Sequence, residues 1–210
     1  MSLVFDDILE KSEALNSEFS RIFDYGPSDE SKRVIASWLM CSVALEHSVS
    51  LRQLMLNGSY TSAICIMRSQ FEAITRATWL FYAASERKVE NTMTSLSELS
   101  QNADQKPSNS EMIKKMVGKA PEQAVQMFND FKDVQWKALN SYVHGGIHAL
   151  QRHGLGYPER LLIDIIKSSN GLLSMTAMMA AILTGNPLIT KDVSKIQLRH
   201  RECLPLLITS

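Results

Sequence analysis

The chain is poor in the residues that build disulfide frameworks, zinc sites and phosphate-binding loops. It has three cysteines in 210 residues, Cys41, Cys65 and Cys203, and no two of them form a Cys-x-x-Cys pair. An odd number of widely spaced cysteines argues against a disulfide scaffold and a thiolate zinc centre, and it favours a reducing cytoplasm. The nine glycines form neither a phosphate-binding loop nor a nucleophile elbow, so the enzyme classes built on those motifs are disfavoured.

The chain also lacks an excess of charge of either sign and a long apolar run. Its 22 basic residues balance 22 acidic ones, which argues against a general nucleic-acid binder, because such proteins displace counterions with surplus Lys and Arg. A nucleic-acid partner would have to meet a local patch. The longest apolar run, Leu172 to Leu183, is too short to span a bilayer, and Asp6 and Asp7 do not fit a signal peptide. We therefore expect a cytoplasmic protein with no membrane partner.

Helical periodicity dominates what is present, and no stretch alternates with the period of a strand. Polar, Gly and Pro breaks predict helices before Gly26-Pro27 and over residues 33–56, 60–84, 111–117, 121–131, from 134 onward, and 159–183. Ser28 or Asp29 is the expected cap of the second helix. No linker divides the chain, so we predict one all-α domain over residues 1–210, a helical bundle of about six or seven helices.

Two polar segments stand apart from this pattern. Residues 101–110 read as a polar loop excursion. Residues 191–201 form a basic C-terminal segment, in which Lys191, Lys195 and Arg199 recur every four residues. Such a stripe is either a solvated face or a face that contacts RNA or an acidic partner.

The eleven methionines and three tryptophans indicate packing first. Met175, Met178 and Met179 fit a bundle core or a dimer seam, with an adaptable binding groove as the alternative, because thioether side chains repack readily. Trp136 and the other two tryptophans are expected to anchor the core.

The best candidate for chemistry is the segment Asn140-Ser-Tyr-Val-His144-Gly145-Gly146. If a helix reaches His144, then Asn140 and His144 lie side by side on one face. Histidine is the side chain that most readily exchanges a proton near neutral pH, so this pair predicts an acid/base or phosphate-binding site. In the structural alternative, His144 only hydrogen-bonds at the helix end and Gly145 supplies a left-handed cap.

Arg68 and Glu72 form a second candidate, four residues apart on an apolar helix. They are either a structural salt bridge or a functional pair. In the functional interpretation, the guanidinium beside a histidine holds a phosphate bidentately and stabilises developing charge while Glu72 orients it. Glu46-His47, followed by Arg52, is a similar polar break in the preceding helix, and solvated polar residues explain it adequately.

A metal site is a third interpretation of the same histidines. His144 and His148 have the spacing of two ligands on one helix, with Glu72 or Glu46 as an oxygen ligand. The glycine pair between the histidines is more typical of a helix end, after which His148 would fall in a turn region. We therefore expect no metal and no cofactor.

The segment from Ala44 to Leu80 resembles the helical hairpin of uncharacterised bacterial HEPN-like proteins. It contains Leu45-Glu46-His47 and Tyr60-x-x-Ala63-x-x-x-Met67-Arg68-Ser-x-x-Glu72, and Leu139-Asn140-Ser-Tyr-Val-His144-Gly-Gly extends the comparison. Many HEPN-like proteins are metal-independent ribonucleases of toxin-antitoxin or phage-defence systems, with an active site formed across a dimer. The resemblance thus implies a helical bundle, a homodimer, an RNA substrate and a protein partner such as an antitoxin.

The resemblance also implies residue roles. His144 would be the acid/base group, Asn140 would position the ribose or phosphate, and Arg68, braced by Glu72, would stabilise phosphate charge. The usual signature is an arginine, then four to six intervening residues, then the histidine, often with an asparagine directly after the arginine, and here the arginine position is Leu139. Either Lys137 or Arg68 would then supply the cation. The alternative function is a non-catalytic helical module that binds a protein partner or a nucleotide, with the Asn140 motif as a hinge.

Overall fold

The computed structural model describes residues 2–93 and 107–206, and this part of the chain is helical, with no strand. Its elements are α1 (Leu3–Ser20), η1 (Arg21–Tyr25), α2 (Lys32–Leu56), α3 (Tyr60–Tyr82), α4 (Glu86–Met93), α6 (Asn109–Met116), α7 (Glu122–Val143), α8 (Ile147–Leu155), α9 (Glu159–Leu183), α10 (Pro187–Arg199) and η2 (Arg201–Cys203). The predicted all-α bundle is confirmed. The described residues form nine α-helices, more than the six or seven expected.

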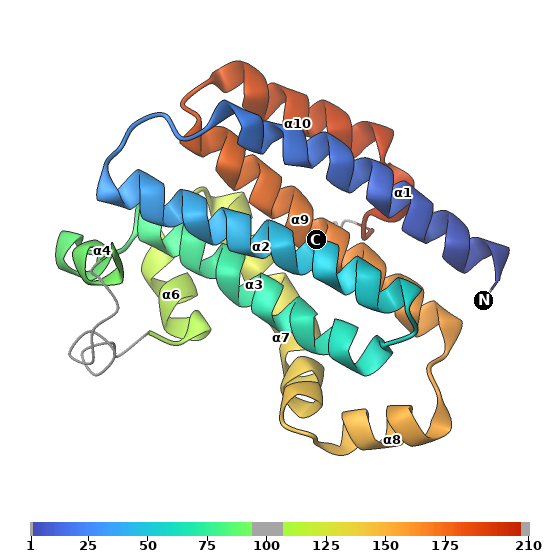
Figure 1. The fold of residues 1–210 in the computed structure, drawn as a ribbon. Helices are drawn as coiled ribbons and strands as arrows, with labels where there is room; N and C mark the ends of the chain where they lie inside the picture. The colour runs from blue at the N-terminus through green and yellow to red at the C-terminus, as the bar shows by residue number, and fades with distance from the viewer. Residues whose placement is uncertain (1, 94–106, 207–210) are drawn as a thin grey trace.

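The antiparallel helices α2 and α3 form the central hairpin of the bundle (Figure 1). α2 packs against both α3 and α9, and contact on two sides explains why its apolar residues are not confined to one face. Among the described helices it is also the one long and apolar enough to cross a membrane, by length and composition alone. Asn57 and Gly58, whose φ is 72°, close the turn to α3. The turn is so short that α3 must return antiparallel to α2.

Arg33 fastens the open end of this hairpin. Its guanidinium donates to the carbonyl oxygens of Leu80, at 2.5 Å, and Ala84, at 2.8 Å. Carbonyl groups at a helix end have no partner within the helix, so Arg33 acts as a cap for α3. With both ends fixed, the hairpin is a rigid platform for the side chains of α3.

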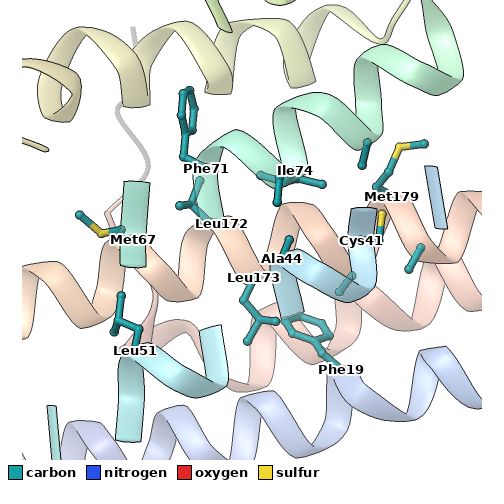
Figure 2. Close-up of a cluster of buried hydrophobic side chains, with 14 of the residues drawn as sticks. Phe19, Cys41, Ala44, Leu51, Met67, Phe71, Ile74, Leu172, Leu173 and Met179 are labelled. Atoms are coloured by element: carbon teal, nitrogen blue, oxygen red, sulfur yellow. The ribbon is translucent and has the colours of Figure 1, made fainter. Parts of the chain in front are cut away.

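α9 lies across the hairpin and closes the core (Figure 2). Phe71 and Ile74 of α3, Leu172 and Leu173 of α9, and Phe19 of α1 are each at most 1% exposed. Burial of such side chains is the main favourable term in folding. The three layers α1, α9 and the hairpin therefore share one core.

One buried polar pair fixes the register between α3 and α9. The Gln70 amide nitrogen donates to Ser169 O at 3.0 Å, and the Ser169 hydroxyl donates to Gln70 Oε1 at 2.7 Å. A slip of one helix along the other would break both hydrogen bonds and leave buried polar atoms without partners. Such a slip is therefore disfavoured.

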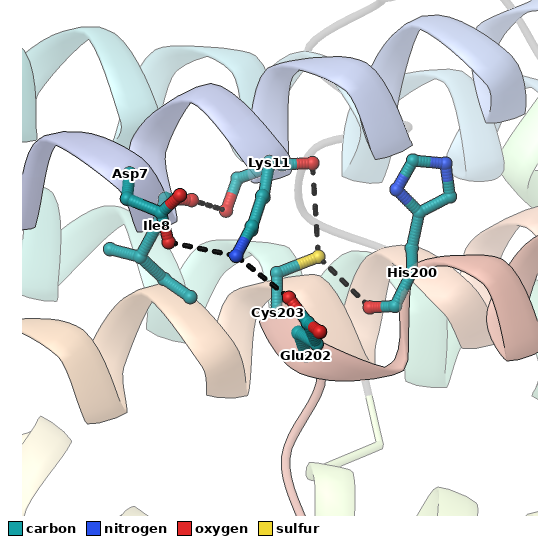
Figure 3. Close-up of polar contacts among 7 residues, drawn as sticks. Asp7, Ile8, Lys11, His200, Glu202 and Cys203 are labelled. Atoms are coloured by element: carbon teal, nitrogen blue, oxygen red, sulfur yellow. Dashed lines mark hydrogen bonds and ion pairs between the residues drawn. The ribbon is translucent and has the colours of Figure 1, made fainter. Parts of the chain in front are cut away.

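Polar contacts fasten the C-terminal segment to α1 (Figure 3). The Lys11 ammonium lies 2.9 Å from Asp7 Oδ2 and 2.7 Å from Glu202 Oε2. These hydrogen bonds raise the pKa of Lys11. The Cys203 thiol donates to the carbonyl oxygens of Lys11 and His200. The segment after α10 is thus held against the bundle.

The basic C-terminal segment is not a free cationic face. Glu18 of α1 pairs with both Arg199 and His200, and Lys195 pairs with Asp192 at 2.8 Å. The hydrogen bond from His200 lowers the pKa of Glu18. The carboxylates of α1 and α10 therefore neutralise much of the stripe that the sequence suggested for RNA or an acidic partner.

The structure corrects four sequence predictions. Residues 121–131 and the helix expected from Val134 are one continuous helix, α7, because no Gly or Pro separates them. The region of His148, expected as a turn, is the helix α8. The cap of α2 is Ser31, whose hydroxyl accepts from Val34 N. α4 was not predicted. Of the polar excursion, residues 101–106 lie outside the described residues, while Ser108 caps α6 in a capping box with Glu111.

A pair of substitutions in α2 tests the central position of the hairpin. Leu51 is 1% exposed and Leu39 is 51% exposed. Leu51→Ala should lower the free energy of unfolding by about 2–5 kcal/mol, because it leaves a cavity in the core, whereas Leu39→Ala should change it by less than about 0.5 kcal/mol. Urea denaturation measures both. Equal effects of the two substitutions would contradict this placement of α2.

Candidate functional site

The candidate site lies where α3 and α7 pack together. α3 presents Arg68 and Glu72, and α7 ends at His144. Arg68 Nη1 lies 3.3 Å from His144 Nε2, and Arg68 Nε donates to Glu72 Oε1 at 2.9 Å. Arg68 and His144 were predicted as parts of two separate candidate sites and are 76 residues apart in the sequence, and they are neighbours within one chain.

Trp136 is a further member of this cluster. The guanidinium carbon of Arg68 lies 4.9 Å from the centre of the Trp136 ring, a distance at which a cation is attracted to the face of an indole. Trp136 in turn packs on Phe71 of the core, with ring centres 5.8 Å apart. The sequence analysis assigned Trp136 to the core only. Trp136, Asn140 and His144 follow one another at intervals of four residues along one face of α7. This spacing could have placed Trp136 beside the candidate site.

These contacts fix the direction of the Arg68 side chain. Glu72 binds the Nε atom, the guanidinium lies over the Trp136 ring, and Nη1 is directed toward His144. The side chain is 20% exposed, so it is held in place and still reachable from solvent. A planar guanidinium can bind a phosphate or carboxylate through two parallel N–H groups, which a lysine ammonium cannot do.

His144 lies at the end of α7, where its backbone and its ring have separate contacts. It is the C-cap of α7, its backbone N–H donates to Asn140 O at 3.1 Å, and Gly145 follows with φ 64°. The side chain is exposed and meets Arg68. Arginine has no acceptor atom, so His144 Nε2 must accept this hydrogen bond, which places the proton of a neutral ring on Nδ1.

A tight turn directs the chain away from the site after His144. An added Cβ on Gly146 would lie 2.6 Å from Ser141 Oγ and 3.2 Å from Ser141 O. The same Ser141 hydroxyl accepts from the backbone N–H of His148 at 3.1 Å. Gly146 is therefore required by close approach, and the turn starts α8 in a new direction.

This turn removes the basis for the metal interpretation. His148 belongs to α8 and lies against the Tyr142 ring, with ring centres 6.2 Å apart. Its spacing from His144 is thus not that of two ligands on one helix. Among the described residues, no group of three or more His, Cys, Asp or Glu side chains is placed to hold a metal ion.

The other candidates on α7 have distinct places. Leu139 is 1% exposed, so its side chain points into the core. Lys137 is exposed on α7. Asn140 is half-buried, and its Oδ1 atom is buried without a hydrogen-bond partner in the described structure. A buried polar atom without a partner carries a cost that a bound donor can remove.

Of the polar residues Glu46, His47 and Arg52 in α2, Arg52 has a structural role. Arg52 is buried and pairs with Glu13 of α1 at 2.5 Å. Burial lowers the pKa of the half-buried His47, and Glu46 is exposed. The Arg52 charge is therefore used to join α2 to α1.

A separate cavity of about 400 Å³ lies between α3, α7, α9 and α10. Met175 and Met178, half-buried, and Met179, buried, all contribute to its lining. The methionines that the sequence suggested for packing thus border an open space. Thioether side chains can adapt to different occupants of such a space.

The fold and site define an all-α protein with an arginine-histidine pair at a helix junction. Residues 41–206 match the model of DUF6988, described as a family of unknown function, and the chain belongs to this family. The match includes Arg68, Glu72, Asn140 and His144. Comparison with curated proteins and with solved structures gave no match.

Two glycine substitutions test the turn that follows His144. Gly146→Ala should lower the free energy of unfolding by about 1–3 kcal/mol, because the new methyl group meets Ser141 and must displace it. Gly154 lies within α8 with nothing within 4 Å of an added Cβ, so Gly154→Ala should stabilise the protein by about 0.5–1 kcal/mol. Thermal unfolding of both variants measures the difference, and a neutral Gly146→Ala would count against this turn geometry.

Proposed function

We propose that this protein is a metal-independent endoribonuclease of the bacterial defence or toxin type, related to HEPN-like proteins. The observation that carries the proposal is the 3.3 Å contact between Arg68 Nη1 and His144 Nε2. It supplies a cation and a proton acceptor at one point of the surface, although Leu139 occupies the usual arginine position. Arg68 takes the place of that arginine from a different helix.

The proposed reaction is transfer of the RNA phosphate to the neighbouring 2′-hydroxyl. His144 Nε2 accepts the proton of the 2′-hydroxyl, whose oxygen attacks the phosphorus atom. The bond to the 5′-oxygen of the next nucleotide breaks, and that oxygen takes a proton from the imidazolium. The products are a 2′,3′-cyclic phosphate and a 5′-hydroxyl. The RNA supplies its own nucleophile, so this reaction uses no metal.

Arg68 serves this reaction in two states. Without substrate, its Nη1–H group donates to His144 Nε2. A phosphate is the stronger acceptor for a guanidinium, so binding of RNA draws the Nη1 and Nη2 groups onto the phosphate oxygens and frees Nε2 to act as base. Glu72 and Trp136 keep the guanidinium in place during this exchange.

Asn140 is the proposed positioning group. It lies one turn before His144 on α7. Its amide oxygen, Oδ1, accepts no hydrogen bond in the described structure. An amide can accept from a ribose hydroxyl and donate to a phosphate oxygen. Rotation of this half-buried amide toward bound RNA would let Oδ1 accept from the ribose hydroxyl and remove the cost of the unpaired atom.

We also propose that the protein forms a homodimer through the surface next to the site. Val143 at the end of α7 and Ile147 and Leu150 of α8 are 41%, 56% and 70% exposed, and Ile147 and Leu150 lie three residues apart on one helix. Exposed apolar residues grouped in this way are typical of a protein interface. A dimer or a protein antitoxin that covers this surface would lie beside His144.

Cleavage of a fluorescent single-stranded RNA tests the chemistry. His144→Ala should lower the cleavage rate by about a hundredfold or more, because the base is lost. Arg68→Ala should cause a similar loss through lost charge stabilisation. Lys137→Ala, which removes an exposed cation of the same helix as His144, should keep most of the activity. Full activity of His144→Ala would rule out its catalytic role.

A chelator and an analysis of the product ends complete this test. EDTA should leave the rate unchanged, and the products should carry cyclic phosphate ends. Activity that disappears with EDTA and returns with a divalent metal would contradict the proposed mechanism.

Sedimentation velocity tests the dimer with a matched pair of variants. Leu150 on α8 is 70% exposed and Leu198 on α10 is 73% exposed. The wild type should sediment as a dimer at micromolar concentrations, Leu150→Glu as a monomer because a charge cannot be buried at the interface without cost, and Leu198→Glu as a dimer. A wild type that remains monomeric at these concentrations would contradict the dimer.

The cavity lined by methionines favours a second candidate function, a non-catalytic module that binds a protein partner or a nucleotide. Its volume of about 400 Å³ falls in the range of small-ligand sites. This function replaces the ribonuclease if the pure wild-type protein cleaves none of a varied set of RNAs.

A further inference from the structure

The cavity lined by methionines lies apart from the arginine-histidine pair. On α3 its lining begins at Thr78, which follows Arg68 by ten residues, or about 15 Å along a helix. On α7 the lining extends no further than Phe128, whereas His144 ends that helix. The cavity, of about 400 Å³, is therefore a separate place for a ligand.

The buried part of the cavity lining is apolar in its behaviour. Phe128 is 1% exposed and packs edge-on against Phe71, with ring centres 6.1 Å apart. Thr78 and Ser174 are also buried, and each hydroxyl donates to the backbone carbonyl one turn earlier in its own helix, at 2.9 Å. Because these hydroxyl groups already have partners, they require no polar atom from a ligand.

The methionines of the lining have room to change conformation. Met127, Met175 and Met178 are half-buried. Met127 and Met175 also border a second cavity of about 180 Å³ between α7, α9 and the segment at Pro205. Flexible thioether side chains with free space beside them can fit apolar ligands of different shapes. The movable side of the cavity is therefore apolar as well.

Neutral polar groups from three helices reach the same cavity. They are Tyr82 of α3 and Gln197 of α10, both half-buried, and the exposed Gln123 of α7. In the part of the chain that the structure describes, these three side chains have no hydrogen-bond partner. Burial raises the pKa of Tyr82, so its hydroxyl keeps the proton that it can donate. These groups can bind a neutral polar group of a ligand.

None of the described residues that line the cavity is charged. Glu122 and Lys195 are next to lining residues in the sequence but do not line the cavity. Glu122 complements the positive end of the α7 dipole, and Lys195 pairs with Asp192 at 2.8 Å. An ion that enters such a cavity loses its hydration without a counter-charge. The phosphates of a nucleotide would meet no cation there.

We infer that this cavity binds an uncharged, largely apolar small molecule that carries a neutral hydrogen-bonding group. The methionines and the Phe128 ring contact the body of the ligand, and Tyr82 and the two glutamines bind its polar group. The inference goes beyond the proposed ribonuclease and does not rest on it, since the lining includes neither Arg68 nor His144.

Two fluorescent dyes test the chemical class of the ligand. N-phenyl-1-naphthylamine and 1-anilinonaphthalene-8-sulfonate share an aromatic body, and only the second carries a negative charge. In fluorescence titrations of the full chain, the uncharged dye should bind at a single site with a micromolar Kd. The sulfonate dye should bind about tenfold more weakly, because its charge has no partner in the cavity.

Three substitutions to phenylalanine test the place of binding. Ala124 is half-buried and lines the cavity, Ser194 lines it at an exposed position of α10, and the exposed Gln126 of α7 does not line it. Ala124→Phe and Ser194→Phe should each weaken binding of the uncharged dye about tenfold, because the new ring occupies the space of the ligand. Gln126→Phe adds the same ring outside the cavity and should leave the affinity unchanged.

Thermal unfolding shows whether each variant is folded, and Ser194→Phe decides the place of binding if Ala124→Phe is not. Equal affinity of the wild type, Ser194→Phe and Gln126→Phe for the uncharged dye would place the dye elsewhere, for example on Val143 and Leu150, and would overturn the inference. No binding by the wild type would overturn it as well. A sulfonate dye that binds as tightly as the uncharged dye would show that the ligand class is wrong.

Discussion

The site depends on how α3 packs against α7 through a group of aromatic rings. Phe71 of α3 stacks on Phe131 of α7 with ring centres 4.5 Å apart, and Trp136 meets Phe71 one turn later. Because Phe71 is fully buried, this contact is part of the core. It brings the face of Trp136 under the Arg68 guanidinium and the end of α7 to within 3.3 Å of Arg68. The geometry of the polar pair follows from apolar packing.

Structural and functional interpretations of the same residues are compatible at this site. Arg68 and Glu72 form the salt bridge that the cautious interpretation predicts, and this salt bridge uses only the Nε atom of Arg68. His144 caps a helix with its backbone, which leaves its ring available. A residue that the fold holds by one part of its structure can present another part to a ligand with little loss of conformational freedom.

The helices with strong end signals could be predicted from the sequence, and the contacts between distant segments could not. Asn57-Gly58 predicted the C-terminal end of α2, and Pro158 predicted the start of α9, each to within a residue or two. Glu18 pairs with Arg199 of the basic stripe from a helix 181 residues earlier in the sequence, and no local pattern reveals this contact. Arg68 and His144 were each chosen from helical spacing, but their contact depends on the packing of α3 on α7. Trp136 was missed because a tryptophan on an apolar face fits a core equally well.

The central claim is that Arg68 and His144 act as one unit. A double-mutant cycle on the RNA cleavage rate tests it most directly, with Arg68→Ala, His144→Ala and the double variant measured against the wild type. Groups that act together in one step are strongly non-additive, so the double variant should be about as slow as the slower single variant. A double variant whose loss equals the product of the two single losses would contradict the account, because the two residues would then act independently.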